Sequence, residues 1–243
     1  MFNKIFCVSD NDYRQIKMNI SNDEIYKIGN PRYDRILNNL ENVEYKLDLS
    51  LKDEGNILIF ASMWDEDNKI IFEKFINSPL VNSFEKVIIV PHEVNDYYLN
   101  YYCSILEDND FSFKKINQYQ NFNQFDEKYI IINKVGFLSK LYAQSTIAYV
   151  GGGFSKSGIH NIIEPAAASN PVIFGSNFLN SNKSDAEGLI DVSGGFSVDS
   201  YELFSEKINW LLDKNNYNNS SKNCKTFVTE NSGSTEKILK ELY

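Results

Sequence analysis

The stretch from Tyr149 to Gly175, YVGGGFSKSGIHNIIEPAAASNPVIFG, constrains the fold of this chain more than any other segment. The apolar run at 146–150 is typical of a buried strand, and the three glycines after it stop that strand. Because Pro165 is tolerated only in the first turn of a helix, a helix must begin between Asn161 and Pro165. A second buried strand follows at 171–175. The segment therefore predicts a strand–loop–helix–strand unit.

The glycine-rich loop of this unit has the composition of an anion-binding site. Free N–H groups and the dipole of the following helix would both point into it, and glycines leave no Cβ to hold a ligand away. A glutamate at the helix start would accept hydrogen bonds from a ribose diol. The alternative is a variant capping box, Asn161-x-x-Glu164, after a plain glycine turn. The candidate binding residues of the loop are Gly151, Gly152, Gly153, Ser155, Lys156, His160, Asn161 and Glu164.

The order GGG, GxHNxxEPAA and NPVIFG resembles the signature of 3-deoxy-D-manno-octulosonic acid (Kdo) transferases. These are GT-B glycosyltransferases that move Kdo from CMP-Kdo onto the lipid A precursor in lipopolysaccharide biosynthesis. Three more segments agree in order and spacing, namely GNPRYD at 29–34, ASMW at 61–64 and VPHE at 90–93. The resemblance covers nearly the whole chain, but only the C-terminal part of such an enzyme.

The alternation of strands and helices predicts a Rossmann-like, doubly wound parallel sheet, which is the C-terminal half of a GT-B fold. The expected strands are 4–8, 24–28, 56–61, 86–90, 111–116, 129–132, 146–150, 171–175 and 194–198. The expected helices are 10–18, 65–76, 95–106, 134–144, 180–190, 200–212 and 235–242, with polar linkers or breaks at 43–54, 117–126 and 215–219. By resemblance, residues 1–42 are a remnant of the N-terminal acceptor domain and the crossing, and residues 43–243 are the donor-binding domain.

Ligands of such sheets bind beyond the carboxyl ends of the strands, and three expected strands end in suitable side chains. Ser62 and Trp64 would contact a phosphate and a base or ribose, although Trp64 would also suit a surface position at a helix start. Pro91 and His92 match the family's CMP-binding segment, where Arg is usual beside the proline. A lone histidine is also a common structural residue. Arg32 is a further candidate, because guanidinium binds carboxylate or phosphate in bidentate fashion; its alternative is a solvated linker charge.

The resemblance implies attack of a lipid A hydroxyl on the anomeric carbon of Kdo, with CMP leaving. Loop N–H groups would stabilise the leaving charge without a metal or cofactor. The acceptor base and the contact with the cytoplasmic face of the inner membrane lie in the family's N-terminal domain. The catalytic residue is therefore unassigned, and we expect this chain alone to bind CMP-Kdo without transferring Kdo. The alternatives are another GT-B enzyme using a UDP-sugar, or a non-catalytic nucleotide-binding fragment.

Composition limits the classes of binding partner and the cellular compartment that the sequence suggests. The net charge of −9 argues against nucleic acid, because phosphate neutralisation needs clustered Lys and Arg. Cys7, Cys103 and Cys224 are far apart, so they predict neither a zinc site nor a disulfide framework, and a reducing cytoplasmic setting fits. The sequence contains no apolar run of about 18 residues, and its first ten residues are unlike a signal peptide.

Overall fold

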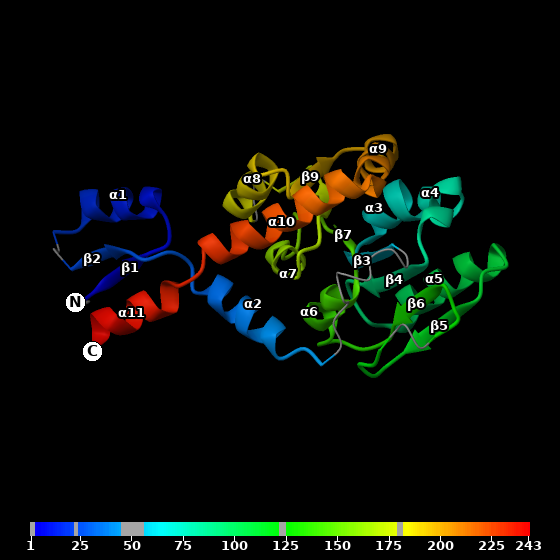
Figure 1. Cartoon of the computed structure of the whole chain (residues 1–243), viewed down its shortest axis with the longest axis horizontal. Helices are drawn as coiled ribbons and strands as arrows, with labels where there is room; N and C mark the ends of the chain where they lie inside the picture. Colours follow the sequence, from blue (N-terminus) through cyan, green and yellow to red (C-terminus); the bar gives the residue numbers. More distant parts are fainter. Residues whose placement is uncertain (1–2, 22–23, 45–55, 122–124, 179–181) are drawn as a thin grey trace.

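The larger part of the molecule is built around a seven-stranded parallel sheet (Figure 1). The computed structural model describes residues 3–21, 24–44, 56–121, 125–178 and 182–243. The sheet order is β5-β6-β4-β3-β7-β8-β9, and every neighbouring pair is parallel, as predicted. Its strands are β3 (Ile57–Met63), β4 (Lys86–Pro91), β5 (Phe113–Ile116), β6 (Tyr129–Ile132), β7 (Ile147–Val150), β8 (Val172–Gly175) and β9 (Gly195–Val198).

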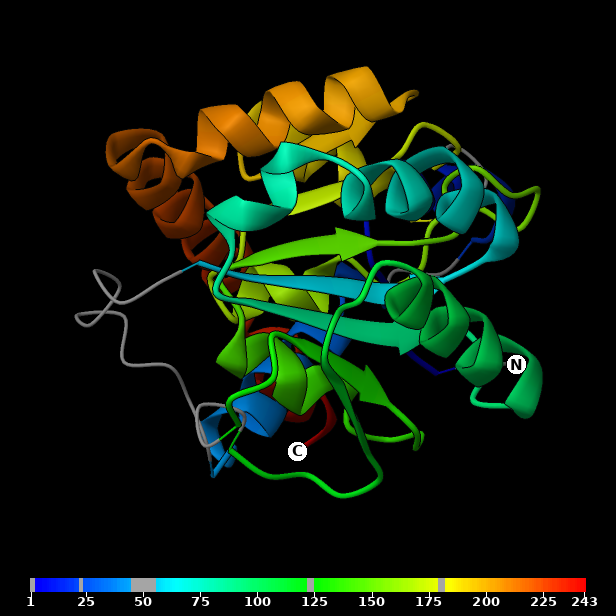
Figure 2. The same cartoon turned by 90° about the vertical axis from the view of Figure 1, so that its right-hand side faces the viewer.

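Helices cover both faces of this sheet (Figure 2), because successive side chains of a strand point to opposite faces. Leu58 and Phe60 of β3 pack toward one helical layer, and Ile57 and Ile59 pack toward the other. The first layer contains α3 (Asp65–Asp67), a π-helical turn (Asn68–Phe72), α4 (Glu73–Ile76), α5 (Asp96–Asp108) and α9 (Tyr201–Leu212). The second contains α2 (Arg32–Glu41), α6 (Leu138–Leu141), α7 (Ile163–Ala167), α8 (Lys183–Asp191) and α10 (Lys214–Glu230).

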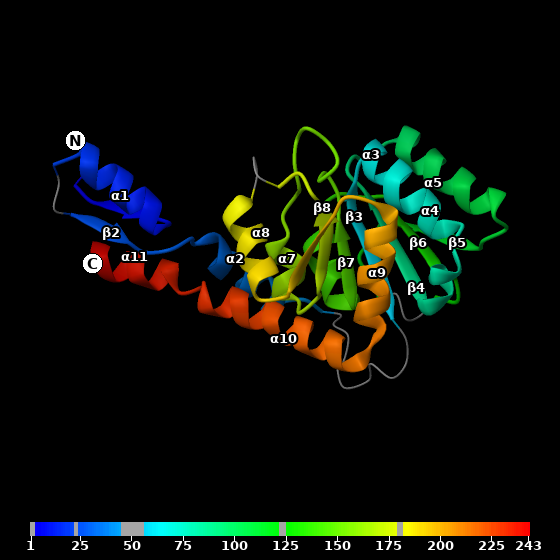
Figure 3. The ribbon, with the colours of Figure 1, turned by 90° about the horizontal axis from the view of Figure 1, so that it is seen from above.

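A small lobe lies at one end of the long axis, with both termini in it (Figures 1 and 3). Its strands β1 (Ile5–Cys7) and β2 (Ile25–Lys27) pair in parallel, and α1 (Asp10–Asn19) and α11 (Ser234–Leu242) flank them. The Asp34 carboxylate fastens α11 by accepting hydrogen bonds from the backbone N–H and the hydroxyl of Thr235, both at 2.8 Å. The chain therefore enters the larger domain after β2 and returns to the lobe after α10.

Several sequence-based expectations about elements were wrong. The helix expected at 134–144 begins only at Leu138, because Gly136 adopts a φ of +93° in a preceding turn. The break expected at 215–219 lies inside α10, and α2 was not anticipated. Strand β3 continues through Ser62, whose φ of +54° accompanies a register shift against β4. The 43–54 linker, part of the 117–126 loop and the start of the 180–190 helix lie outside the described residues.

No helix among the described residues is both long enough and apolar enough to cross a membrane.

Candidate functional site

Three aromatic rings meet at the carboxyl ends of β3, β4 and β7. Trp64 follows β3, His92 follows β4, and His160 lies in the loop after β7. The rings of Trp64 and His92 stack with centroids 3.9 Å apart, and His92 and His160 lie 4.6 Å apart. The indole Nε1–H of Trp64 donates to Nε2 of His160 at 2.7 Å. The expected convergence of the strand ends is therefore present; whether these residues bind a ligand stays a prediction. We call Trp64, His92 and His160 the ring cluster.

The hydrogen bond within the ring cluster determines where the proton of His160 lies. Burial lowers the pKa of His92, and burial together with the nearby charge of His92 lowers the pKa of His160. Both rings are therefore neutral at neutral pH. Because Nε2 of His160 accepts from Trp64, the proton of the neutral ring lies on Nδ1, which leaves Nδ1–H as a donor. A neutral His92 also supplies no positive charge beside Pro91.

The glycine loop is shaped by close backbone contacts rather than by an open space for a ligand. A Cβ at Gly151 would lie 2.4 Å from the carbonyl oxygen of Ser62. At Gly152, whose φ is +95°, a Cβ would lie 2.4 Å from the carbonyl oxygen of Gly158. A Cβ at Gly153 would meet Gly175 at 2.5 Å. The protein's own backbone packing therefore requires glycine at these positions, and whether the loop also makes room for a phosphate stays a prediction.

The loop nevertheless offers hydrogen-bond donors. Within the part of the chain that the structure describes, the backbone N–H groups of Gly153 and Phe154 donate to no acceptor. The helix that follows, α7, contains five residues, so few peptide dipoles align in it and its macrodipole is small. Any anion held here would therefore depend on individual N–H groups rather than on the expected helix dipole.

Asn161 and Glu164 bond to each other at the start of α7. The amide of Asn161 donates to Glu164 Oε1 at 2.8 Å, and Oδ1 of Asn161 accepts from the backbone N–H of Ile163 at 3.1 Å. This arrangement differs from the capping box that was the alternative interpretation, because the glutamate does not accept from the helix backbone. Burial raises the pKa of Glu164, while its bond to Asn161 and the charges of Arg35 and Arg32 oppose that shift.

The remaining candidates of the loop and the strand ends have different surroundings. The buried hydroxyl of Ser155 donates to the Gly152 carbonyl at 2.9 Å, which closes the turn. Lys156 is exposed. Pro91 is the buried last residue of β4, and Ser62 is half-buried in the bulge of β3. Of these four, only Lys156 is freely available to a ligand at the surface.

One carboxylate that the sequence reasoning missed, Asp67, joins the site segments. It is fully buried, and it accepts hydrogen bonds from the backbone N–H of Gly152 at 2.8 Å and from Tyr149 Oη at 2.7 Å. It also accepts from the backbone N–H of Trp64 at 3.1 Å. Burial raises its pKa, and these hydrogen bonds oppose the shift. The sequence feature that could have identified Asp67 is its place as an acidic residue at the third position of the helix that begins after Trp64.

Arg32 links the loop to a cavity beneath the small lobe. Its guanidinium pairs with Asp185 and donates to Asn182 Oδ1 at 3.3 Å, and the amide of Asn182 donates to the carbonyl of His160 at 3.2 Å. The buried Nε of Arg32 has no partner within the described residues. Arg32 is therefore held by the protein and is not the solvated charge of the alternative interpretation.

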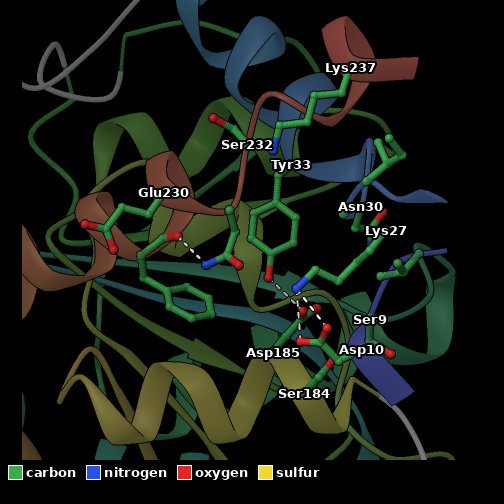
Figure 4. Close-up of a pocket in the computed structure, with 15 residues that line it drawn as sticks. Ser9, Asp10, Lys27, Asn30, Tyr33, Ser184, Asp185, Glu230, Ser232 and Lys237 are labelled. Atoms are coloured by element: carbon green, nitrogen blue, oxygen red, sulfur yellow. Dashed lines mark hydrogen bonds and ion pairs between the residues drawn. The ribbon is translucent and has the colours of Figure 1, made fainter. Parts of the chain in front are cut away.

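The cavity beside Asp185 has a volume of about 430 Å³. Figure 4 shows Lys27, Tyr33 and Asp185 pointing toward one another in it. The Tyr33 hydroxyl donates to Asp185 at 2.8 Å. The cavity is lined by residues of the lobe and of α8, α10 and α11, and the ring cluster is not among them. This cavity is therefore distinct from the ring cluster, and Asp185 and Arg32 connect the two.

Comparison with known proteins tests the predicted resemblance to the Kdo transferases. No family model matches the chain. The chain is 26% identical to the Kdo transferase of Chlamydia trachomatis serovar D over 244 residues, and 27% identical to that of Rickettsia bellii over 252 residues. These matches cover 97% and 99% of this chain. The predicted resemblance to the Kdo transferases is confirmed. The chain spans 55% and 56% of the length of these two relatives.

Solved structures support the same fold. The C-terminal CMP-Kdo binding domain of WaaA from Acinetobacter baumannii matches with a TM-score of 0.60 and 16% identity, over 82% of this chain and 98% of that domain. An α-glucosyltransferase solved with UDP and DNA matches with a TM-score of 0.54 and 14% identity, over 98% of this chain and 64% of the other. At such identities the likeness shows the fold alone, and the fold is that of GT-B glycosyltransferases, as predicted.

Proposed function

We propose that this chain is the donor-binding part of a Kdo transferase and that it holds CMP-Kdo beside the ring cluster and the glycine loop. The observation that carries the proposal is the meeting of Trp64, His92 and His160 at three strand ends. The resemblance to Kdo transferases over nearly the whole chain supports CMP-Kdo as the donor.

The neighbouring groups suggest how the nucleotide is held. The phosphate of CMP would accept hydrogen bonds from Nδ1–H of His160 and from the free N–H groups of Gly153 and Phe154. Glu164 would accept from the ribose hydroxyls through the carboxylate oxygen that Asn161 leaves free. Lys156 would supply a positive charge at the rim. Neutral donors in a buried site stabilise the charge that grows on departing CMP without prior reorganisation.

The reaction that we propose for the assembled enzyme is transfer of Kdo to the lipid A precursor in lipopolysaccharide biosynthesis. A hydroxyl of the acceptor attacks the anomeric carbon of Kdo as its bond to the CMP phosphate breaks, and the hydroxyl proton passes to a base. We place this reaction at the cytoplasmic face of the inner membrane, where the acceptor would be presented. No metal or other cofactor is invoked.

Calorimetric titration of the purified chain with CMP, UMP and UDP tests the donor. We expect CMP to bind more tightly than either uridine nucleotide. Equal or tighter binding of UDP would move the chain to another GT-B activity that uses a UDP-sugar. Incubation with CMP-Kdo and lipid A precursor, followed by mass spectrometry for an added Kdo, tests the acceptor.

A further inference from the structure

The buried carboxylate of Asp67 bonds to three of the segments that carry the proposed donor site. Its Oδ2 accepts from the backbone N–H groups of Trp64 and Gly152, and its Oδ1 accepts from the hydroxyl of Tyr149. Trp64 lies at the end of β3, Tyr149 lies in β7, and Gly152 lies in the glycine loop. One side chain therefore joins two strands and the loop between which the ring cluster forms.

The chemistry of these three partners suits an ionised carboxylate. An N–H or hydroxyl donor faces each bonded oxygen, and charge-assisted hydrogen bonds of this kind are stronger than neutral ones. No cation is within ion-pair distance of Asp67 among the described residues. Burying a charge without a counter-ion is costly, so a position that served packing alone would be filled better by an apolar residue.

The same bonds anchor both partners of the Trp64–His160 hydrogen bond. The Trp64 backbone is held directly by Asp67. On the other side, Asp67 holds Gly152, and the neighbouring Gly151 carbonyl accepts from the backbone N–H of His160 at 3.2 Å. Displacing the carboxylate would therefore free the indole and the loop together.

We propose that Asp67 is a positioning residue for donor binding: it sets the Trp64–His160 hydrogen bond and thereby aims Nδ1–H of His160 at the nucleotide. This inference rests on the proposed function for its ligand, and on contacts within the protein for its geometry. Asp67 itself does not touch the nucleotide.

The test is the substitution Asp67→Asn, read by CMP calorimetry and by the indole N–H resonances in ¹⁵N NMR spectra. The chain has only two tryptophans, so the Trp210→Phe variant assigns the resonance of Trp64. We expect CMP to bind about tenfold more weakly, and the Trp64 indole resonance to move upfield toward the position of a solvated indole. Unchanged affinity together with an unchanged resonance would overturn the proposal.

Two variants serve as matched controls. Glu66→Gln removes one negative charge from the same turn at an exposed position, and we expect it to change neither readout. Tyr149→Phe removes one donor from Asp67 but leaves both backbone bonds, so it should lower the melting temperature and keep CMP affinity within twofold. If Tyr149→Phe weakens CMP binding as much as Asp67→Asn does, Asp67 acts only through general stability and the proposal fails.

The two readouts separate this proposal from the proposed function. If the native chain does not bind CMP but Asp67→Asn still moves the Trp64 resonance, the donor assignment is wrong and the positioning role stands. If Asp67→Asn does not fold, amide hydrogen exchange of the native protein supplies the test. We expect the amides of Trp64 and Gly152 to be protected together, and rapid exchange of Gly152 alone would overturn the link.

Discussion

Replacement of Glu164 by Gln should weaken nucleotide binding without destabilising the folded protein. Burial raises the pKa of Glu164 above its ordinary value of 4.5, so the folded protein favours the protonated acid. The associated stabilisation is complete below the unfolded pKa and is lost as pH rises through the folded pKa. At pH 7 the native protein therefore carries the cost of a buried charge, which Glu164→Gln removes while an amide oxygen still accepts from Asn161.

The expected loss in binding follows from the hydrogen bonds that the carboxylate would make. A hydrogen bond from a ribose hydroxyl to a charged acceptor contributes about 1.5–3 kcal/mol. Since roughly 1.4 kcal/mol corresponds to a tenfold change in affinity, Glu164→Gln should weaken CMP binding by about 10-fold to 150-fold. The melting temperature at pH 7 should stay the same or rise, and this difference should vanish below about pH 4, where both side chains are neutral.

Calorimetry and thermal unfolding of the same preparations measure both effects. Glu187→Gln is a suitable control, because Glu187 is exposed and, among the residues that the structure describes, its ion pair is with Lys183 of its own helix. A fall in melting temperature with unchanged CMP affinity would show that Glu164 only supports the start of α7. That result would refute the ribose assignment.

Two further predictions concern the loop and the ring cluster. Gly153→Ala should lower the free energy of unfolding by about 1–3 kcal/mol in urea titrations, because its Cβ would meet Gly175 at 2.5 Å. Because burial lowers the pKa of His92 and His160, their stabilisation is present above the unfolded pKa and is lost as pH falls below about 6.5. The double variant His92→Gln/His160→Gln should therefore show a flatter decline of melting temperature with acidification, and an unchanged slope would contradict neutral rings in the folded state.

The sheet could be predicted because its strands are short apolar runs bounded by turns. The helix α10 could not, since its sequence KNNYNNSSKNCKTFVTE is almost entirely polar. It buries small residues such as Ser220, Ser221 and Cys224, which fit a close approach to neighbouring elements but give no apolar period. The expected helix at 134–144 failed for the opposite reason. Its apolar spacing was suitable, but Gly136 takes a left-handed conformation that the sequence pattern does not reveal.

The candidate site was predictable in its location and not in its internal bonding. The rule that ligands bind at strand ends brought Trp64, His92 and His160 to one place. The sequence could not indicate that the Trp64 indole is already bonded to His160, because that pairing depends on the register of β3 against β7. Asp67 was overlooked because it lies among other acidic residues, and its burial follows from the path of β7 and the glycine loop.

The two connections between the lobe and the larger domain run side by side. Gly29 and Gly233 both adopt positive φ angles, of +101° and +88°, and the Ser234 hydroxyl donates to the Ile28 carbonyl at 3.2 Å. A lobe attached through one segment of chain can swing and twist freely. A lobe attached through two adjacent segments is restricted mainly to rotation about one axis. The double connection therefore restricts how the lobe can move against α8, and with it the shape of the cavity that the lobe and α8 line together.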